Sequence, residues 1–328
     1  MPLVRVERRG RCAWVTLDRP PLNLFTLELI AAVRETFDTL ARDAGVGAAV
    51  LTGAGRAFTA GMQVQVLHDL TPASAKVLIT SLHEAIHAVH EAPFPTIAMV
   101  NGACLGAGFE LAMACDIRTA ADGARLGLPE VKVGVPSVIE AALLPALVGP
   151  GRAAEILLTG EPVDAAQALD WGLVNRVAAP DKLEAVTAEM AQLILACAPG
   201  AIRLQKELIV RWRNADLSSA IRFGINAFAQ SYATGEPRDA AQALDWGLVN
   251  RVAAPDKLEA VTAEMAQLIL ACAPGAIRLQ KELIVRWRNA DLSSAIRFGI
   301  NAFAQSYATG EPREATLAFL EKRRPKFE

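Results

Sequence analysis

One stretch of the sequence, residues 95–116, constrains the fold of this chain most strongly. It opens with an apolar, β-branched run at 96–100, which predicts a buried strand. Asn101 and Gly102 end that run, and a loop of small residues follows at 103–108. Apolar residues then recur at helical spacing, so the stretch predicts a strand, a tight turn with few side chains, and a helix.

Such a helix start is a place where a substrate can lie against the backbone. The first N–H groups of a helix have no partner within the helix, and the helix dipole favours negative charge beside them. Small residues allow a bound molecule to approach these groups, and Glu110 adds a carboxylate that can move protons. We therefore expect residues 95–116 to form the floor of an active site.

The sequence before residue 138 alternates segments typical of strands with segments typical of helices. Strands are expected at 12–17, 48–51, 96–100, 117–120 and 125–128, and helices at 27–42 and 74–90. After residue 138 the pattern is helical, apart from a short strand at 173–177. This order indicates an α/β core followed by a helical C-terminal part.

The charge balance argues against several classes of partner. The 328 residues carry a net charge of −2 without a block of Lys and Arg, so we expect neither nucleic acid nor an anionic membrane as partner. Polar residues interrupt every long apolar run, so no transmembrane helix is predicted. The first ten residues are charged and lack the apolar core of a signal peptide.

The cysteines indicate a reducing compartment. They stand singly at positions 12, 104, 115, 197 and 272, without a CxxC pair. We expect buried thiols rather than disulfides, and a cytoplasmic protein.

An identical internal repeat is the least ordinary feature of the chain. Residues 164–238 recur unchanged as residues 239–313, an offset of 75, and the tetrapeptide TGEP flanks both copies. Solenoid repeats have shorter units that diverge in sequence, so this is not a solenoid. We interpret it as a tandem duplication within an ancestral domain of 253 residues, 75 fewer than the present 328.

The repeat predicts three parts: a core with the active site at 1–163, a first copy at 164–238, and a second copy with a tail at 239–328. Each copy carries amphipathic helices that need a partner surface, and the core offers one native docking place. We expect one copy to dock there while the other forms an added lobe or joins another subunit. The sequence leaves open which copy docks.

Three segments, taken together, resemble the crotonase (enoyl-CoA hydratase/isomerase) superfamily. They are GRAFTAGM at 55–62, NGACLGAGFELAMACD at 101–116 and GLPEVKVG at 127–134. Each alone has a bland explanation as a tight turn or a solvated carboxylate, but their order and spacing match the family. The resemblance covers residues 3 to about 238 and the tail at 314–327. It implies an α/β fold with a crotonase-type spiral of ββα units and a helical C-terminal trimerisation region, part of which is duplicated here.

The resemblance also implies a site and a reaction. The backbone N–H groups of Met62 and Ala107 would form an oxyanion hole, and Glu110 and Glu130 would act as the catalytic acid–base pair. Residues expected to bind substrate and coenzyme A are Leu22, Ala60, Gly61, Gln63, Val64, Gln65 and Gly106. The implied reaction is hydration of a trans-2-enoyl-CoA to a 3-hydroxyacyl-CoA by a homotrimer or hexamer, with no metal or other cofactor and with CoA as substrate carrier.

Other functions on this scaffold stay open. An enoyl-CoA isomerase or an acyl-CoA hydrolase would use the same oxyanion hole, and a non-catalytic acyl-CoA-binding protein would use only the binding residues. The sequence departs from the family pattern at Gln63, where Asp is usual, and at Ser137 and Glu140, where a Gly-rich turn is frequent. These departures leave the acyl chain and the reaction to be decided.

Two further motifs are present without the context that their chemistry requires. Residues 83–87 read HEAIH and match the HExxH zinc signature, but we expect these histidines on the solvated side of a helix, and the glycine and distal His of metzincins are missing. Gly106 and Gly108 resemble part of a dinucleotide fingerprint, but Leu111 occupies the third glycine position. We therefore expect neither zinc nor a dinucleotide.

Overall fold

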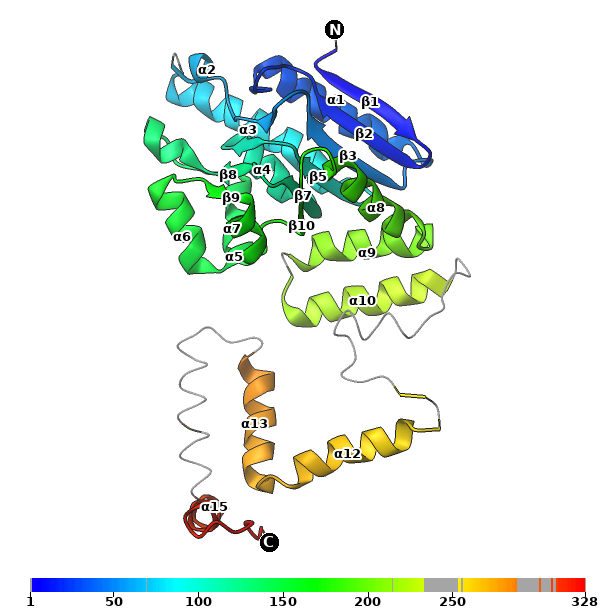
Figure 1. The fold of residues 1–328 in the computed structure, drawn as a ribbon, viewed down its shortest axis with the longest axis vertical. Coiled ribbons are helices and arrows are strands. Elements are labelled where there is room, and N and C mark those ends of the chain that lie inside the picture. The colour runs from blue at the N-terminus through cyan, green and yellow to red at the C-terminus, as the bar shows by residue number, and fades with distance from the viewer. Residues whose placement is uncertain are drawn as a thin grey trace. The chain divides into compact units, whose positions relative to one another are not determined.

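The fold is described from a computed structural model (Figure 1). It describes residues 2–68, 70–213, 215–232, 253–254, 256–287, 301, 308 and 311–327. The chain divides into two compact units, of which the first comprises Met1–Arg213 with Gly224–Glu236 and the second comprises Asn214–Phe223 with Pro237–Glu328. Each is described by itself.

The first unit is built from repeated strand–strand–helix segments. These are β1 (Val4–Arg9), β2 (Cys12–Leu17) and α1 (Leu27–Arg42), then β3 (Ala48–Gly53), β4 (Ala57–Thr59), α2 (Val64–His68) and α3 (Pro72–His90), then β5 (Thr96–Val100), β6 (Ala103–Leu105) and α4 (Ala107–Ala114), and finally β7 (Ile117–Ala121) and β8 (Arg125–Gly127). Short 3-10 turns η1 (Pro129–Val133) and η2 (Glu140–Leu143) come next.

The remaining elements are mainly helices. In the first unit they are α5 (Leu144–Val148), α6 (Pro150–Thr159), β9 (Val163–Asp164), α7 (Ala165–Asp170), β10 (Arg176–Ala178), α8 (Leu183–Leu195) and α9 (Pro199–Trp212). Helix α10 (Leu217–Tyr232) contributes to both units. The second unit contains α12 (Leu258–Leu270), α13 (Pro274–Trp287) and α15 (Glu311–Leu320).

The strands of successive repeats alternate between two sheets. Among the described residues, one sheet has the order β1-β2-β3-β5-β7-β10 and the other has the order β4-β6-β8-β9. From β3 to β8, the first strand of each pair joins the larger sheet and the second joins the smaller one, with parallel pairing between repeats. This alternation is the spiral of ββα units, so the expected α/β fold of the crotonase type is confirmed.

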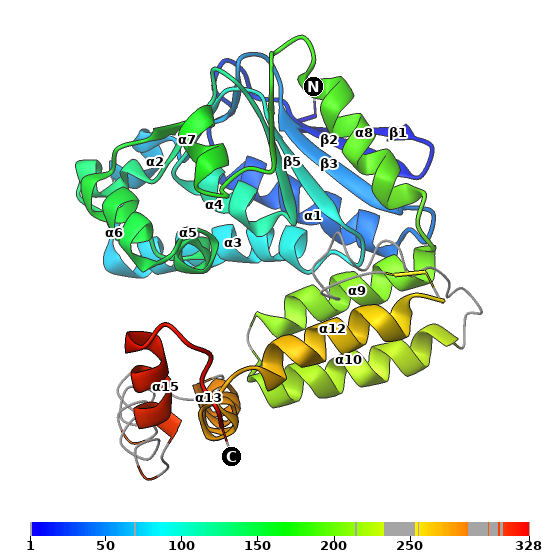
Figure 2. The ribbon, with the colours of Figure 1, turned by 60° about the horizontal axis from the view of Figure 1, so that its bottom comes forward.

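Helices cover the larger sheet and bury its apolar side chains. Helix α1 begins at the cap Thr26 and presents a stripe to the core made of Leu29, Ile30, Val33, Phe37 and Leu40. Helix α8 packs against β3, β5 and β7 (Figure 2). The core therefore lies between the larger sheet and the helices α1 and α8, and α3 packs against α1 and α4.

The structure corrects several local expectations. Strand β6 lies inside the segment 103–108 that was expected to be a loop, and β4 lies inside the small-residue segment 52–62, also expected to be a loop. Both have three residues, too few to show the alternation from which a strand is predicted. Cys272 is exposed and Cys197 is partly exposed, so the expectation of buried thiols is wrong for these two.

The two identical copies lie in different environments. In the first copy, Leu183 is 3% exposed and the Thr187 hydroxyl lies 2.6 Å from that of Thr119. In the second copy, Leu258 has the position of Leu183 in the repeat and is 55% exposed. Thus α8 of the first copy is docked on the core, and α12, the same sequence in the second copy, buries less of its surface.

A buried ion pair fastens the first copy. The Lys206 ammonium on α9 donates 2.8 Å hydrogen bonds to the Asp116 carboxylate and to the His90 carbonyl. Its counterpart Lys281 on α13 is exposed. The boundaries predicted at 163 and 238 stay predictions, and much of the second copy, including 239–252, lies outside the described residues.

In the described ranges, no single helix is long and apolar enough to cross a membrane, although two bent pairs, α8 with α9 and α12 with residues 274–282, pass that test together on length and composition.

Hydrogen exchange followed by mass spectrometry tests the unequal docking directly. Peptides from α8 and α9 have the same masses as those from α12 and α13, so each should show two isotope envelopes of equal intensity that exchange at rates differing about tenfold or more. Peptides from residues 12–17 or 96–100 occur once and serve as a control with a single envelope. One envelope for the repeated peptides would show that both copies are equally protected and would contradict the structure.

Candidate active site

The turn that opens α4 is built around Gly106. Its φ is +55°, which favours glycine, and a Cβ there would lie 2.7 Å from Glu130 Oε1. The Gly106 N–H donates a 2.9 Å hydrogen bond to the Gly127 carbonyl at the end of β8. Since Glu130 follows in η1, this bond brings its carboxylate to the turn.

Glu110, in the first turn of α4, is a buried carboxylate. It is 3% exposed, and its Oε1 accepts hydrogen bonds from the N–H groups of Ala141 (2.9 Å) and Ile139 (3.2 Å). Burial raises the pKa of Glu110 to about 7, and the charges of Glu130 and Glu140 add to this rise, whereas the two N–H donors oppose it. Near neutral pH this group can therefore both take up and release a proton.

Glu130 is the second carboxylate at the turn and is partly buried. Its Oε2 accepts a 2.8 Å hydrogen bond from the Ser137 hydroxyl. Burial raises the pKa of Glu130, and the Ser137 hydrogen bond lowers it in part. The structure thus brings Glu110 and Glu130 together at one turn, as predicted from their motifs.

The N–H groups of Met62 and Ala107 are available to a ligand. Met62 forms a parallel bridge with Phe25, in which Gly61 and Gln63 supply the hydrogen-bonding groups, so the N–H of Met62 points away from Phe25. Ala107 is the first residue of α4, whose N–H has no partner within the helix. Within the part of the chain that the structure describes, neither group has a hydrogen-bond acceptor.

Gly61 places these two donors in neighbouring segments. Its φ is +89°, and a Cβ there would lie 2.9 Å from the Leu105 carbonyl oxygen and 3.7 Å from the Ala107 nitrogen. The chain around Gly61 therefore touches the turn before α4. Two unpaired N–H donors and two carboxylates with raised pKa values meet in this region.

The residues predicted to bind coenzyme A lie beside these donors. The Ala60 N–H donates a 3.0 Å hydrogen bond to the Leu22 carbonyl, and the Gln63 side chain accepts one of 2.8 Å from Arg19. Val64 and Gln65 begin α2 with exposed side chains. These residues, together with Gly61 and Gly106, belong to neighbouring segments of the chain. Their role in binding the substrate and coenzyme A stays a prediction.

Sequence reasoning did not assign a role to Glu140 and His83. Glu140 is 8% exposed, and its Oε1 lies 2.8 Å from Nδ1 of His83. The sequence marked Glu140 only as a departure from the family and His83 only as part of the rejected HEAIH motif. A charged residue inside the apolar run at 138–145 was the signal that could have shown its importance.

In the described ranges, no group of three His, Cys, Asp or Glu residues could hold a metal ion. His83 and His87 have ring centroids 5.4 Å apart, and His83 already contacts Glu140. The predicted lack of a metal and of other cofactors stays a prediction.

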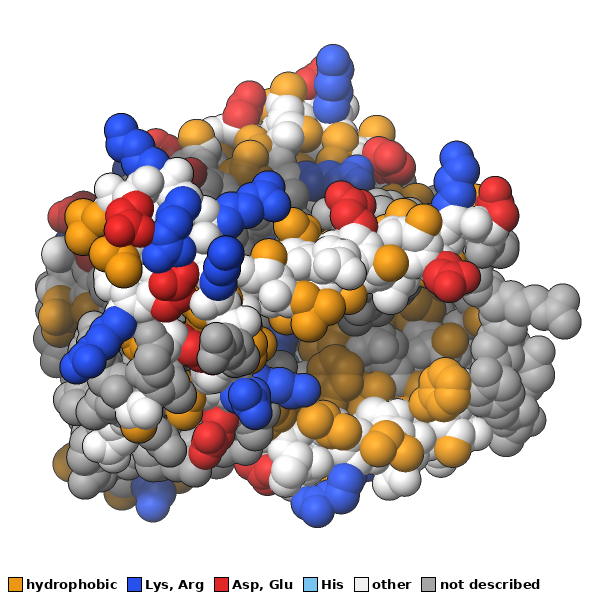
Figure 3. Space-filling model, turned by 90° about the horizontal axis from the view of Figure 1, so that it is seen from below, with side chains coloured by type: hydrophobic (Ala, Val, Ile, Leu, Met, Phe, Trp, Pro, Cys, Tyr) orange, Lys and Arg blue, Asp and Glu red, His pale blue; other side chains and the backbone are white. Residues whose placement is uncertain are grey.

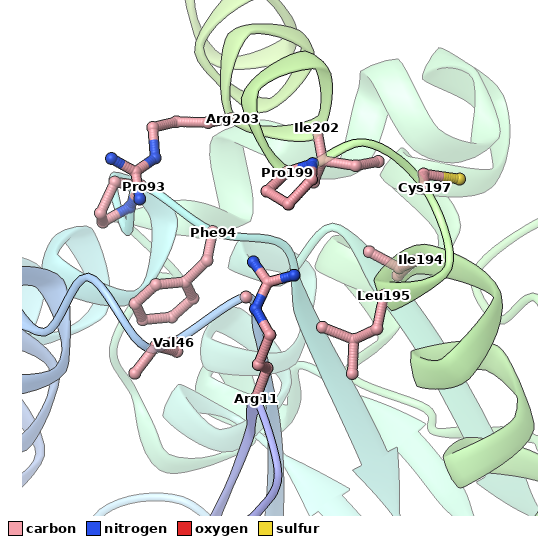
Figure 4. Close-up of a pocket in the computed structure, with 11 residues that line it drawn as sticks. Arg11, Val46, Pro93, Phe94, Ile194, Leu195, Cys197, Pro199, Ile202 and Arg203 are labelled. Atoms are coloured by element: carbon pink, nitrogen blue, oxygen red, sulfur yellow. The ribbon is translucent and has the colours of Figure 1, made fainter. Parts of the chain in front are cut away.

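A small cavity elsewhere in the first unit does not belong to this site. Arg11, Phe94 and Leu195 point into it (Figure 4), and none of the predicted site residues lines it. Its volume of about 20 Å³ gives room for about one water molecule. It is too small for an acyl chain.

Comparison with known proteins identifies the family. The family model described as enoyl-CoA hydratase/isomerase matches residues 7–234 and, separately, 223–328. The short-chain-enoyl-CoA hydratase of Clostridium acetobutylicum is 34% identical over 244 residues, which are 74% of this chain and 94% of that protein. A putative enoyl-CoA hydratase of Thermus thermophilus is 36% identical over 246 residues, 74% of this chain and 97% of that protein.

A solved structure agrees with these sequence relatives. The crystal structure of an enoyl-CoA hydratase of Mycobacterium smegmatis matches with a TM-score of 0.69 and 32% identity, covering 70% of this chain and 91% of that one. Because the family model matches more than half of the chain and relatives above 30% identity align along nearly their whole length, the chain belongs to the enoyl-CoA hydratase/isomerase family of the crotonase superfamily.

Proposed function

We propose that this protein is an enoyl-CoA hydratase, which adds water across the C2=C3 bond of a trans-2-enoyl-CoA to give a 3-hydroxyacyl-CoA. The observation that carries the proposal is the meeting of Glu110 and Glu130 at the Gly106 turn, each with a raised pKa. The relatives named as enoyl-CoA hydratases support the same reaction.

The oxyanion hole is the first part of the proposed mechanism. When water attacks C3, negative charge develops on the thioester carbonyl oxygen. The N–H groups of Met62 and Ala107 have no acceptor among the described residues and can donate to that oxygen. Each such donor is typically worth about 3–4 kcal/mol in the transition state.

The two glutamates complete the addition. Glu110 acts as the base, because the amides of Ile139 and Ala141 stabilise its carboxylate form. It takes one proton from water while the water oxygen bonds to C3. Glu130, whose pKa is raised by burial, donates a proton to C2.

The second carboxylate separates the hydratase from its alternatives. An isomerase needs one group that carries a proton between two carbons, and an acyl-CoA-binding protein needs none. A second carboxylate with a raised pKa at the turn favours hydration over both. An acyl-CoA hydrolase would attack the thioester carbonyl instead, and release of free CoA would identify it.

Substrate binding completes the assignment. We assign the CoA part of the substrate to the surface formed by Leu22, Ala60 and Gln63 with the start of α2. The proposal requires no metal and no redox cofactor, because the oxyanion hole and the two glutamates account for every charge and proton that moves. The unpaired cysteines agree with a cytoplasmic location.

Self-association into a trimer or hexamer is also part of the proposal. Helix α10 exposes Leu217, Ile221 and Ile225, which recur every four residues and therefore share one face. Apolar side chains also reach the surface among charged ones on the face seen in Figure 3. An apolar helix face of this kind suits a second copy of the chain.

Crotonyl-CoA is the substrate for the first test. Its enoyl-thioester absorbance should fall rapidly when the protein is added, and Glu110→Gln and Glu130→Gln should each lower kcat about 10²–10⁴-fold, because each removes one proton carrier. Glu35→Gln, on an exposed position of α1, is the matched control and should leave kcat unchanged. Full turnover in both site variants would show that the acid–base pair is assigned wrongly.

The pH dependence tests the protonation state of the base. Since Glu110 must be ionised to accept a proton and has a pKa of about 7, kcat/KM should fall tenfold per pH unit as the pH drops below about 7. A kcat/KM that stays constant from pH 7 down to pH 5 would exclude Glu110 as the base.

Light scattering after size exclusion tests the oligomer. The chain mass is 34.9 kDa, and a trimer or hexamer should appear at three or six times that value. Ile221→Asp and Ile225→Asp should reduce the assembly by burying a charge in the contact. A wild-type mass of one chain would refute the assembly.

A further inference from the structure

Glu140 is a buried charged residue for which the proposed mechanism has no role. Its Oε1 contacts His83, whereas its Oε2 is the buried side-chain polar atom without a hydrogen-bond partner among the described residues. Burial of a carboxylate oxygen without a partner costs free energy. A purely structural position would be better filled by an apolar side chain, as most positions of the run at 138–145 are.

The location of Glu140 links it to Glu110. The residues directly before and after it, Ile139 and Ala141, donate the two N–H hydrogen bonds that hold Glu110 Oε1. The backbone that carries Glu140 is therefore the cradle of the proposed base. The charge of Glu140 is also close enough to that of Glu110 to disfavour ionisation of Glu110.

His83 anchors Glu140 from the opposite element. It projects from α3 with a side chain 48% exposed, whereas the Glu140 side chain is 9% exposed. The contact between His83 and Glu140 therefore connects the exposed surface of α3 with the buried first residue of η2. Because η2 begins at Glu140, this contact fixes the first residue of the turn whose amides reach Glu110.

We propose that Glu140 is a positioning residue for the base Glu110: anchored by His83, it holds the amides of Ile139 and Ala141 on Glu110 Oε1 and sets a second negative charge beside it. The inference rests on the proposed function, in which Glu110 is the base. It gives a shared role to two residues that the sequence motifs did not explain. Glu140 stands where the family often has a Gly-rich turn, and His83 belongs to the HEAIH segment.

The charged groups around Glu110 and Glu140 determine whether the pKa of Glu110 rises or falls when the charge of Glu140 is removed. Glu110 faces Glu130 from η1 and Glu140 from η2, and both raise its pKa. Glu140 faces His83 and His87 from α3; burial raises the pKa of Glu140, and the hydrogen bond to His83 opposes that rise and favours the ionised form. Replacing Glu140 by Gln, which keeps the shape of the side chain and so leaves the amides of Ile139 and Ala141 in place, should therefore lower the pKa of Glu110.

The test is a carboxyl ¹³C NMR titration of Glu110 in the free, full-length protein, with the signal assigned from its loss in Glu110→Gln. Glu140→Gln keeps the shape of the side chain but removes its charge, and should lower the pKa of Glu110 by about half a unit or more. Glu84→Gln makes the same chemical change next to His83, on a side chain that contacts Arg34, and should not shift it.

His83→Phe is the second variant, at a half-exposed position where folding is not at stake. Without its donor, Glu140 takes up a proton more readily, its charge beside Glu110 declines, and the pKa of Glu110 should fall by less than in Glu140→Gln. In the double variant the shift should equal that of Glu140→Gln alone, because His83 acts through Glu140. Additive shifts would overturn the anchoring role.

Kinetics separate this inference from the proposed function. In Glu140→Gln the acidic limb of kcat/KM for crotonyl-CoA should move to lower pH by the same amount as the NMR shift. An unmoved Glu110 titration in an active enzyme overturns the inference and leaves the hydratase intact. A shifted titration in a protein that does not hydrate crotonyl-CoA supports the coupling of the two glutamates and refutes the proposed reaction.

Discussion

The site depends on the closeness of the backbone to Glu130 at Gly106. No side chain fits there, because a Cβ would lie 2.7 Å from a carboxylate oxygen. The absence of that side chain brings the first turn of α4, the end of β8 and η1 to one point. The positions of these three segments then place Glu110, Glu130 and the N–H of Ala107 close together. A single contact between the backbone and a carboxylate therefore organises the site.

The second constraint is the burial of Glu110. Burial disfavours its charge, and the amides of Ile139 and Ala141 recover part of that cost by donating to one oxygen. The balance leaves a carboxyl that ionises near neutral pH. An exposed glutamate would be ionised there and a weaker base, whereas a buried one without donors would stay protonated.

The sequence predicts the motifs better than the contacts between them. Strand β5, helix α1 and the helix after Gly106 follow from apolar periodicity, and the three family segments locate Glu110 and Glu130. The three-residue strands β4 and β6 escape prediction because they are too short to show a period. The pairing of His83 with Glu140 joins residues 57 positions apart, and no local pattern reveals a contact of that kind.

The duplicated helices raise a question of timing rather than of stability. Lys206 and Asp116 are 90 residues apart, and Lys281 would close a loop 75 residues longer to reach the same carboxylate. Loop-closure entropy then separates the two copies by only about 0.5 kcal/mol. During synthesis, however, the first copy leaves the ribosome while the second does not yet exist, and domains fold from the N-terminus onward. Translation thus gives the first copy an uncontested approach to the core, an advantage that a chain refolded from denaturant lacks.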